Sequence, residues 1–185
     1  MKGSKEQKRV IKLRTPIADS EIKKLRIGDQ IEINGMIYCG RDAVLPKLVS
    51  LIEGNALQSI NVDLKGTVIF HTAVSLAGVG PTTSSKVEIE GSIPALSKAG
   101  VKIHLGKGAL SLVTTEQLKK NNSVFAITPP ISALFSDKTV SHRVVAFEEE
   151  GMEALYELDV KELPAIIAIA HGESIFSQGV KSVGC

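Results

Sequence analysis

Short runs of branched apolar residues alternate with helical patterns through the middle of this 185-residue chain. The runs at 64–70, 101–105 and 124–127 are rich in Val, Ile and Leu and have the length of buried strands. The segments between them contain Ser and Thr at positions suited to capping a helix. Strands and helices that alternate in this way pack as layers. The sequence therefore predicts a mixed α/β fold with flanking helices and more than one sheet.

Paired strands are expected near both ends of the chain. Residues 30–39 alternate apolar and polar side chains around Asn34-Gly35, a hairpin signal that predicts two strands joined by a tight turn. Three more segments have the composition of separate closing strands, at 144–147, 156–160 and 165–170. We therefore expect paired strands on either side of the central alternation.

Two helices are placed by their first residues. One is predicted to open at Gly40-Arg41-Asp42 and to run to about Glu53, with apolar side chains along one face. The other runs through Lys120, and Thr114 or Thr115 is its expected cap because the spacing to the following acidic and amide residues fits a capping box. These starts fix where the loops between strands and helices lie.

Composition and charge argue against two classes of protein. The chain has 22 Lys and Arg against 20 Asp and Glu, a net charge of +2, and aromatic residues make up 4% with no Trp. Such a balanced charge and so few stacking side chains argue against nucleic-acid binding. The longest apolar run, Ala165–Ala170, is far shorter than the ~20 residues of a membrane span. The basic N-terminus lacks the apolar segment of a secretory signal, so a cytoplasmic protein is expected.

A single domain is expected over residues 20–178, preceded by an N-terminal extension and first strand at 1–19 and followed by a tail at 179–185. Cys39 and Cys185 are expected to be reduced thiols. Two scattered cysteines cannot by themselves hold an iron–sulfur cluster or a structural zinc ion. The chain is therefore expected to bind no metal or cofactor of its own.

The densest group of chemically useful side chains is the segment Gly80-Pro-Thr-Thr-Ser-Ser-Lys86. Four adjacent hydroxyls lie between a Gly-Pro turn and a cation. If a helix starts here, its free N–H groups and its dipole favour an anion, and the segment then describes a carboxylate or phosphate site. A helix cap with spare hydroxyls explains the same residues equally well.

Two further cations follow predicted strands. Arg41 lies at a strand-to-helix junction, where its guanidinium can grip a carboxylate. The alternative is that Asp42 caps the helix and Arg41 pairs with it locally. Lys107 stands between two glycines that permit close approach to a ligand, and a plain exposed turn is the alternative. His71 ends a strand beside the hydroxyl segment and could reach the same site. The histidines lack the spacing of metal ligands.

Several short segments follow one another in a fixed order over about residues 20–178. They are Ile27-Gly-Asp29, Gly35-Met-Ile-Tyr38, Arg41-Asp42, Gly80-Pro-Thr-Thr-Ser84, Gly106-Lys-Gly108, Val144–Ala154, Asp159-Val160 and His171-Gly172. In this order and spacing they resemble the β subunit, or C-terminal domain, of class I fumarate hydratases and L-tartrate dehydratases. Each segment is moderately specific, and the set together is much more so.

The resemblance implies a swivelling β/β/α domain. It also implies an oxygen-sensitive hydro-lyase that reversibly hydrates fumarate to (S)-malate, with its [4Fe-4S] cluster on a separate α subunit in an α2β2 assembly. Dehydration of tartrate or a related hydroxy-diacid is the alternative activity within the same family.

By the same resemblance, Arg41 and Lys107 hold the dicarboxylate substrate. Thr82 takes the position of the family's catalytic hydroxyl, and Thr83 lies beside it as a substrate-binding residue. Lys86 stands where the family usually has Arg, and a Lys keeps the charge but loses the bidentate fork.

Two more positions depart from the family pattern. The segment His71–Gly78 is short and lacks the usual Gly-Pro and Pro-rich loop, and Leu45 stands where many members have His. These differences motivate a second hypothesis of another class. The chain would then be a non-catalytic or repurposed module that binds a small anion or a partner subunit.

Overall fold

The computed structural model describes residues 10–75, 78–80, 86–129 and 132–177. Most of its strands belong to one mixed eight-stranded sheet. Its strands are β1 (Ile11–Arg14), β2 (Gln30–Cys39), β3 (Val68–Phe70), β6 (Ile103–Gly106), β7 (Val124–Ile127), β8 (Thr139–Ala146), β9 (Leu155–Ala170) and β10 (Glu173–Ser174). The first five of these neighbour one another in the order given and run parallel.

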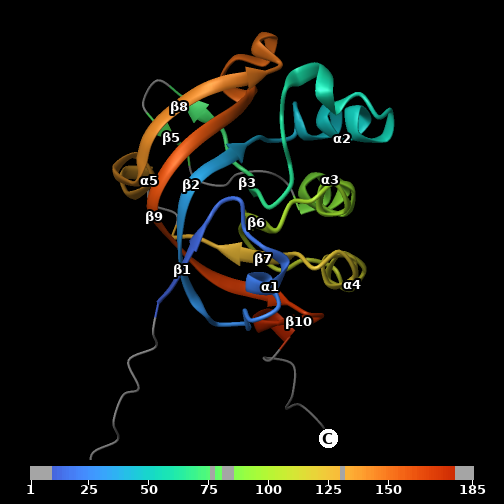
Figure 1. Cartoon of the computed structure of the whole chain (residues 1–185), viewed down its shortest axis with the longest axis vertical. Helices are drawn as coiled ribbons and strands as arrows, with labels where there is room; N and C mark the ends of the chain where they lie inside the picture. Colours follow the sequence, from blue (N-terminus) through green and yellow to red (C-terminus); the bar gives the residue numbers. More distant parts are fainter. Residues whose placement is uncertain (1–9, 76–77, 81–85, 130–131, 178–185) are drawn as a thin grey trace, which may run out of the picture.

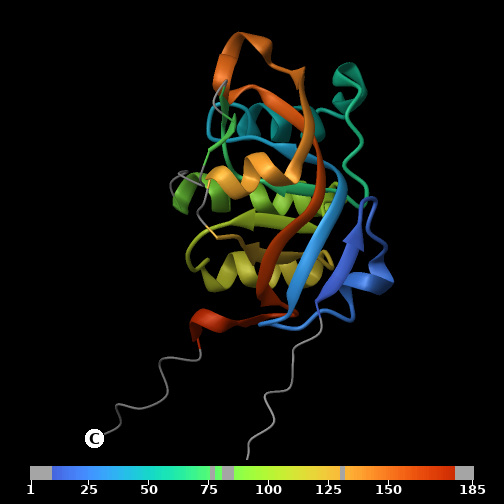
Figure 2. The same ribbon diagram turned by 90° about the vertical axis from the view of Figure 1, so that its left-hand side faces the viewer.

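The long strand β9 closes this sheet on itself. It pairs antiparallel with β7 and also along most of its length with β2. Ile166 is a partner of both Gln30 on β2 and Ile127 on β7. The circuit β2–β3–β6–β7–β9 is therefore complete, and the sheet is barrel-like, with the curved strands β2 and β9 crossing its front in Figure 2.

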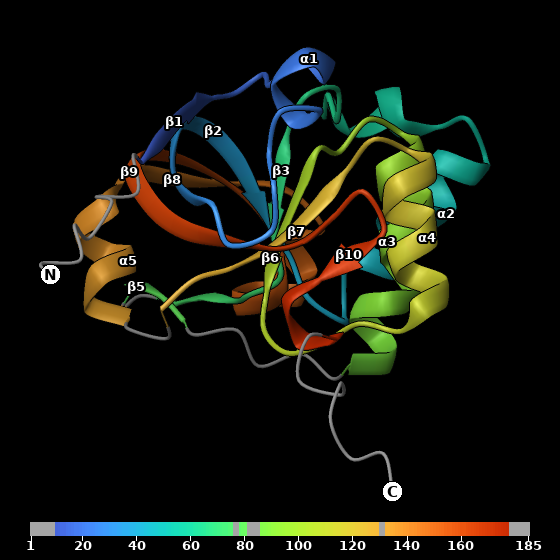
Figure 3. The same cartoon turned by 90° about the horizontal axis from the view of Figure 1, so that it is seen from below.

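Helices cover one side of the sheet because each parallel connection contains one. The helices α2 (Leu45–Glu53), α3 (Lys86–Lys98) and α4 (Leu112–Lys120) connect β2 to β3, β3 to β6 and β6 to β7 in turn. Figures 1 and 3 show the three stacked along one side, with α5 (Ser132–Lys138) opposite. The remaining elements are α1 (Asp19–Ile22), β4 (Val74–Ser75), β5 (Gly78–Val79) and the 3₁₀ turns η1 (Leu57–Ile60), η2 (Glu148–Glu153) and η3 (Ile175–Ser177).

Two apolar layers separate along each strand because neighbouring side chains point to opposite faces. Ile69 packs with Leu48 and Leu96 under the helices. The next residue, Phe70, belongs to the cluster on the other face, where its ring meets that of Phe135 edge-on at 5.1 Å. The mixed sheet with flanking helices confirms the predicted mixed α/β class. The second sheet is only the two-stranded pair β4–β5.

The expected hairpin at Asn34-Gly35 is wrong. Residues 30–39 form one continuous strand, and the Asn-Gly pair is a bulge where the register with β9 shifts. Gly35 has a φ of +94°, and a Cβ there would lie 2.6 Å from Thr15 Oγ1. Asn34 Oδ1 accepts a hydrogen bond from the Glu162 backbone N–H at 3.0 Å, so a side chain of β2 and the backbone of β9 together stabilise the bulge.

The expected separate strands at 156–160 and 165–170 are also wrong, because they are parts of one strand. The intervening Pro164 lies opposite Glu32 of β2 and does not break the pairing. Proline lacks an N–H donor, and strands tolerate it where no ladder hydrogen bond is required of it. The continuity of β9 is what closes the sheet.

Candidate functional site

Three parallel strands end side by side, and the predicted cations follow two of them. Hydrogen bonds continue one step past the strands, with Gly40 N donating to Phe70 O at 3.1 Å and His71 N donating to Leu105 O at 2.9 Å. The carboxyl ends of parallel strands form one edge of a sheet, where ligands of α/β proteins commonly bind. This row of strand ends carries Arg41, His71 and Lys107.

Arg41 follows β2 and already has carboxylate partners. Its Nη1 lies 3.3 Å from Glu153 Oε1, and its Nη2 lies 3.8 Å from Asp42 Oδ2. Its Nε is buried and has no hydrogen-bond partner in the part of the chain described. The helix α2 begins after Val44 without a side-chain cap, so the alternative of a capping Asp42 is wrong, whereas local pairing with Arg41 is present. Arg41 is thus a fixed cation that a ligand must share with Glu153.

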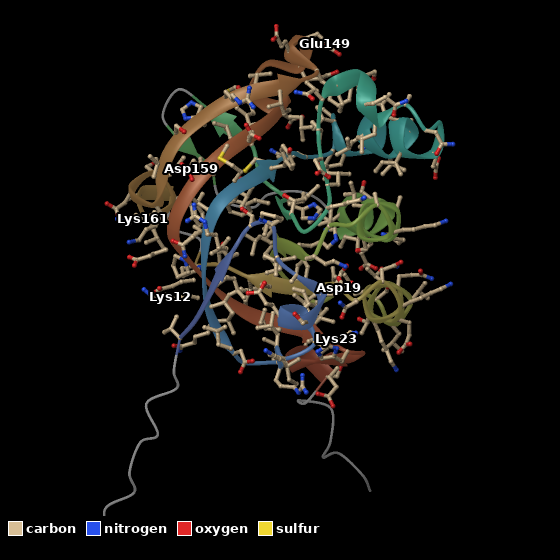
Figure 4. The ribbon with its side chains drawn as sticks, in the orientation of Figure 1. Lys12, Asp19, Lys23, Glu149, Asp159 and Lys161 are labelled. Carbon is tan, nitrogen blue, oxygen red and sulfur yellow. The ribbon has the colours of Figure 1, made fainter. Side chains whose placement is uncertain are left out.

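Ion pairs between α2 and η2 hold Glu153 in this position. Lys47 of α2 contacts Glu149 at 3.1 Å, and it also binds Glu150. Figure 4 shows Glu149 at the tip of the molecule, well away from Asp19 and Lys23 near α1. The acidic turn η2 therefore packs beside the end of β2.

Lys107 lies in an exposed turn between β6 and α4. Gly106 is required here, because a Cβ would lie 2.9 Å from the Phe125 ring. Gly108 has a φ of +75°, which favours glycine, but the space around it is open. The predicted turn is therefore present with Lys107 exposed, which fits both a ligand-binding turn and a plain exposed turn.

The chain leading into the hydroxyl segment is anchored beside the end of β3. The Thr72 hydroxyl donates to Gly80 O at 2.6 Å, and Gly80 N donates to Ala73 O at 2.9 Å. Lys86, the last residue of this segment, is the first residue of α3. The predicted catalytic Thr82, its neighbour Thr83 and the Lys86 side chain lie outside the described residues.

A carboxylate not singled out by the sequence ties α3 to α4. Glu90 of α3 accepts hydrogen bonds from Ser111 N at 3.0 Å and from the Thr114 hydroxyl at 2.5 Å, and the Ser111 hydroxyl also binds it. Ser111 is the N-cap of α4, accepting from Thr114 N at 3.2 Å, so the expected cap at Thr114 or Thr115 is wrong. This network stabilises the start of α4, just after the Lys107 turn, and ties it to α3.

His71 is buried rather than open to the site edge. Its Nε2 lies 3.3 Å from His104 Nδ1, and the other nitrogen of His104 lies 2.9 Å from Ser97 Oγ. Burial lowers the pKa of His71 to about 4 and, together with the neighbouring His71, lowers the pKa of His104. Both rings are therefore neutral at pH 7. The sequence did not predict this cluster.

The other ionisable groups considered as metal ligands are Cys39 and the acidic and histidine side chains of the described residues. Burial raises the pKa of the Cys39 thiol, which disfavours the thiolate that a metal needs. Among the described residues, no three His, Cys, Asp or Glu side chains are grouped to hold an ion. None of the described helices is long and apolar enough to cross a bilayer.

The amino-acid sequence of this chain matches a known protein family. The pattern of the fumarase C-terminus family matches residues 1–179. The chain belongs to this family. The recognition made from the short motifs is confirmed.

Named relatives fall into two groups. The chain is 31% identical to a protein of Geobacillus stearothermophilus provisionally named as a class I fumarate hydratase, over 95% of this chain but 35% of that protein. It is 31% identical to the L(+)-tartrate dehydratase subunit beta of Escherichia coli K12, over 91% of this chain and 88% of the relative. A provisionally named tartrate dehydratase subunit beta of Methanocaldococcus jannaschii is 27% identical, over 90% of this chain and 91% of the relative. The chain thus spans about a third of the hydratase and most of each β subunit.

Proposed function

We propose that this chain is the β subunit of a two-subunit cytoplasmic hydro-lyase that reversibly hydrates fumarate to (S)-malate. The observation that carries the proposal is the row of strand ends with Arg41 and Lys107, in a chain that belongs to the fumarase C-terminus family. The family's swivelling β/β/α arrangement is part of the same proposal, in which this domain closes over the partner subunit.

Each site residue has a distinct task in this reaction. Arg41 and Lys107 bind the two carboxylates, because guanidinium and ammonium groups form charge-assisted hydrogen bonds to such oxygens. Lys86, at the start of α3, adds positive charge where the helix dipole also favours an anion. The Thr82 hydroxyl moves the proton at the reacting carbon, and Thr83 binds substrate beside it. Arg41 exchanges part of its pairing with Glu153 for the substrate carboxylate.

The family resemblance implies a [4Fe-4S] cluster on the α subunit. An iron with an open position would act there as a Lewis acid on substrate oxygens. Our proposal gives this chain no cluster ligand, because its described residues include one buried cysteine and no grouped donors. Its residues instead bind and orient the diacid.

Tartrate dehydration is the second candidate. The match covers 88% of the E. coli tartrate dehydratase β subunit but 35% of the fumarate hydratase relative. Tartrate is also a dicarboxylate, so the same cations would hold it. An added hydroxyl changes binding in a pocket by a modest factor unless a polar group is built to recognise it.

The test is anaerobic co-purification of the full chain from its native cells, followed by assays with fumarate, (S)-malate and L-tartrate. Hydration of fumarate by a complex with an iron-containing partner supports the first candidate, and preferential loss of tartrate supports the second. A complex without activity on any diacid supports the non-catalytic module.

The role of Thr82 is tested in the same complex. Thr82→Ala should lower kcat by about 10²-fold or more, the usual contribution of a positioned proton-transfer group. Thr82→Ser keeps the hydroxyl and should retain most activity. Wild-type turnover in Thr82→Ala would exclude the assigned role.

A further inference from the structure

Three buried polar side chains, hydrogen-bonded in series, link three elements beneath the candidate site. Ser97 Oγ of α3 lies 2.9 Å from His104 Nε2 of β6, and His104 Nδ1 lies 3.3 Å from His71 Nε2 beyond β3. The two rings stack with centroids 5.6 Å apart and planes at 29°. All three side chains are at most 2% exposed. None of these three side chains contacts the substrate in the proposed reaction.

The hydrogen bonds between these three side chains all run in one direction, from Ser97 through His104 to His71. The Ser97 hydroxyl carries one hydrogen, and among the described residues its hydrogen-bond partner is His104 Nε2. If His104 Nε2 carried a proton and donated to Ser97, the buried Ser97 hydrogen and the His71 Nδ1 lone pair would both lack partners among the described residues, whereas the opposite direction leaves only the His71 Nδ1–H unmet. Ser97 therefore donates to His104 Nε2. His104 then donates through Nδ1–H to His71 Nε2, and His71 keeps its own proton on Nδ1.

His71, the last of these three side chains, has one donor without a partner among the described residues. Within the described residues, the buried His71 Nδ1 has no hydrogen-bond partner. His71 directly follows β3, between the strands whose ends carry Arg41 and Lys107. The series of hydrogen bonds therefore reaches from Ser97 in the last turn of α3 to His71 in the middle of the row of strand ends.

Stability alone does not explain these residues. Apolar side chains of similar volume often stabilise a core as well as, or better than, a buried polar group with an unmet donor. Hydrogen bonds differ from apolar contacts in fixing direction and register. They are suited to holding α3 at one position on β3 and β6, and α3 begins at Lys86 beside the hydroxyl segment.

We propose that Ser97, His104 and His71 form a directional hydrogen-bond relay whose members are positioning residues of the candidate site, setting the position of α3 relative to β3 and β6. The link to turnover rests on the proposed function. The direction of the relay and its effect on the position of α3 are independent of the proposed function.

The direction is tested by ¹⁵N NMR of the histidine rings in the full chain at pH 7. Both His71 and His104 should be neutral with the proton on Nδ1. A proton on Nε2 of either ring would overturn the proposed direction. This experiment needs neither partner nor substrate.

The positioning role is tested with Ser97→Ala, which removes only the first donor. Amide hydrogens of α3 beyond its first turn should exchange about fivefold faster, the size expected for losing one hydrogen bond. Ser92→Ala, at a second buried serine of α3, is the matched control and should leave exchange unchanged. Equal exchange in Ser97→Ala and wild type would exclude the role.

Activity gives a separate readout in the assembled enzyme. The apolar triple variant Ser97→Ala/His104→Leu/His71→Phe should keep or raise Tm while kcat/KM falls about tenfold or more, because the two effects have different causes. Full activity in this variant would contradict the positioning role. If the wild-type complex acts on no diacid, the proposed function fails, and the exchange measurement still decides the role of the relay.

Discussion

Arg41 Nη1 lies 3.3 Å from Glu153 Oε1, although the two residues are separated by more than half of the chain. The contact joins the end of β2 to the turn before β9. It places a carboxylate of the protein where the proposed substrate offers one of its own. Arg41 is therefore both oriented by Glu153 and partly occupied by it.

Substitution of Glu153 separates these two effects. Glu153→Gln keeps the shape and an acceptor oxygen but removes the competing charge, so KM for the diacid should fall by about twofold to fivefold, the range of a partly exposed ion pair. Glu153→Ala removes the orienting contact as well and should raise KM. Steady-state kinetics of the assembled enzyme measure both, and a shared rise in KM would contradict the competing role.

Lys107 offers a test of substrate binding without a stability effect. Because its side chain is exposed, Lys107→Ala should leave thermal unfolding unchanged. It should raise KM for the diacid about tenfold or more, as expected for one charge-assisted hydrogen bond. Lys65→Ala, at another exposed lysine, is the control. An unaltered KM would remove Lys107 from the site.

The two glycines beside Lys107 should differ in their tolerance of alanine. Gly106→Ala forces a Cβ to within 2.9 Å of the Phe125 ring and should cost about 1–3 kcal/mol of unfolding free energy. Gly108→Ala meets no atom within 4 Å and pays only for its positive φ, about 1 kcal/mol. Urea unfolding of both variants measures the difference, and a larger loss in Gly108→Ala would contradict the packing argument.

Acid should destabilise the fold through the buried histidines. Burial lowers the pKa of His71 from 6.5 to about 4, so the unfolded chain takes up a proton below pH 6.5 that the native chain refuses until about pH 4. The stabilisation is present above pH 6.5 and is lost as the pH falls toward 4. His71 alone should cost about 2 kcal/mol between pH 7 and pH 5.

Urea unfolding at both pH values measures this loss. His71→Phe should flatten the pH dependence. An unchanged slope in His71→Phe would show that other groups cause the acid sensitivity.

The sequence predicted local features better than long-range pairing. The span of β7 matched at both ends, because Val124–Ile127 is a short branched run between clear breaks. The Asn34-Gly35 hairpin failed because pairing with β9, more than 120 residues later, outweighs the local turn preference. The prediction of two strands in place of β9, separated at 161–164, failed for the same reason: pairing with β2 outweighs the local break signals.

The same distinction applies to the candidate site. Arg41 and Lys107 were found from their position directly after strands, a local pattern. Glu90, Ser97 and His104 were not, because each acts through a partner on another element, such as Ser111 for Glu90. Their residue types alone gave no signal, since single buried polar residues most often serve only as satisfied core groups.

The double pairing of β9 also bears on how the chain is made. During synthesis, β2, β3, β6 and β7 are all made before residues 155–170. Until then β2 and β7 each present a bare backbone edge, and such edges invite pairing with other chains. The nascent protein is thus most exposed to aggregation in the interval before its last long strand emerges, and a chaperone that binds strand edges would be most useful at that moment.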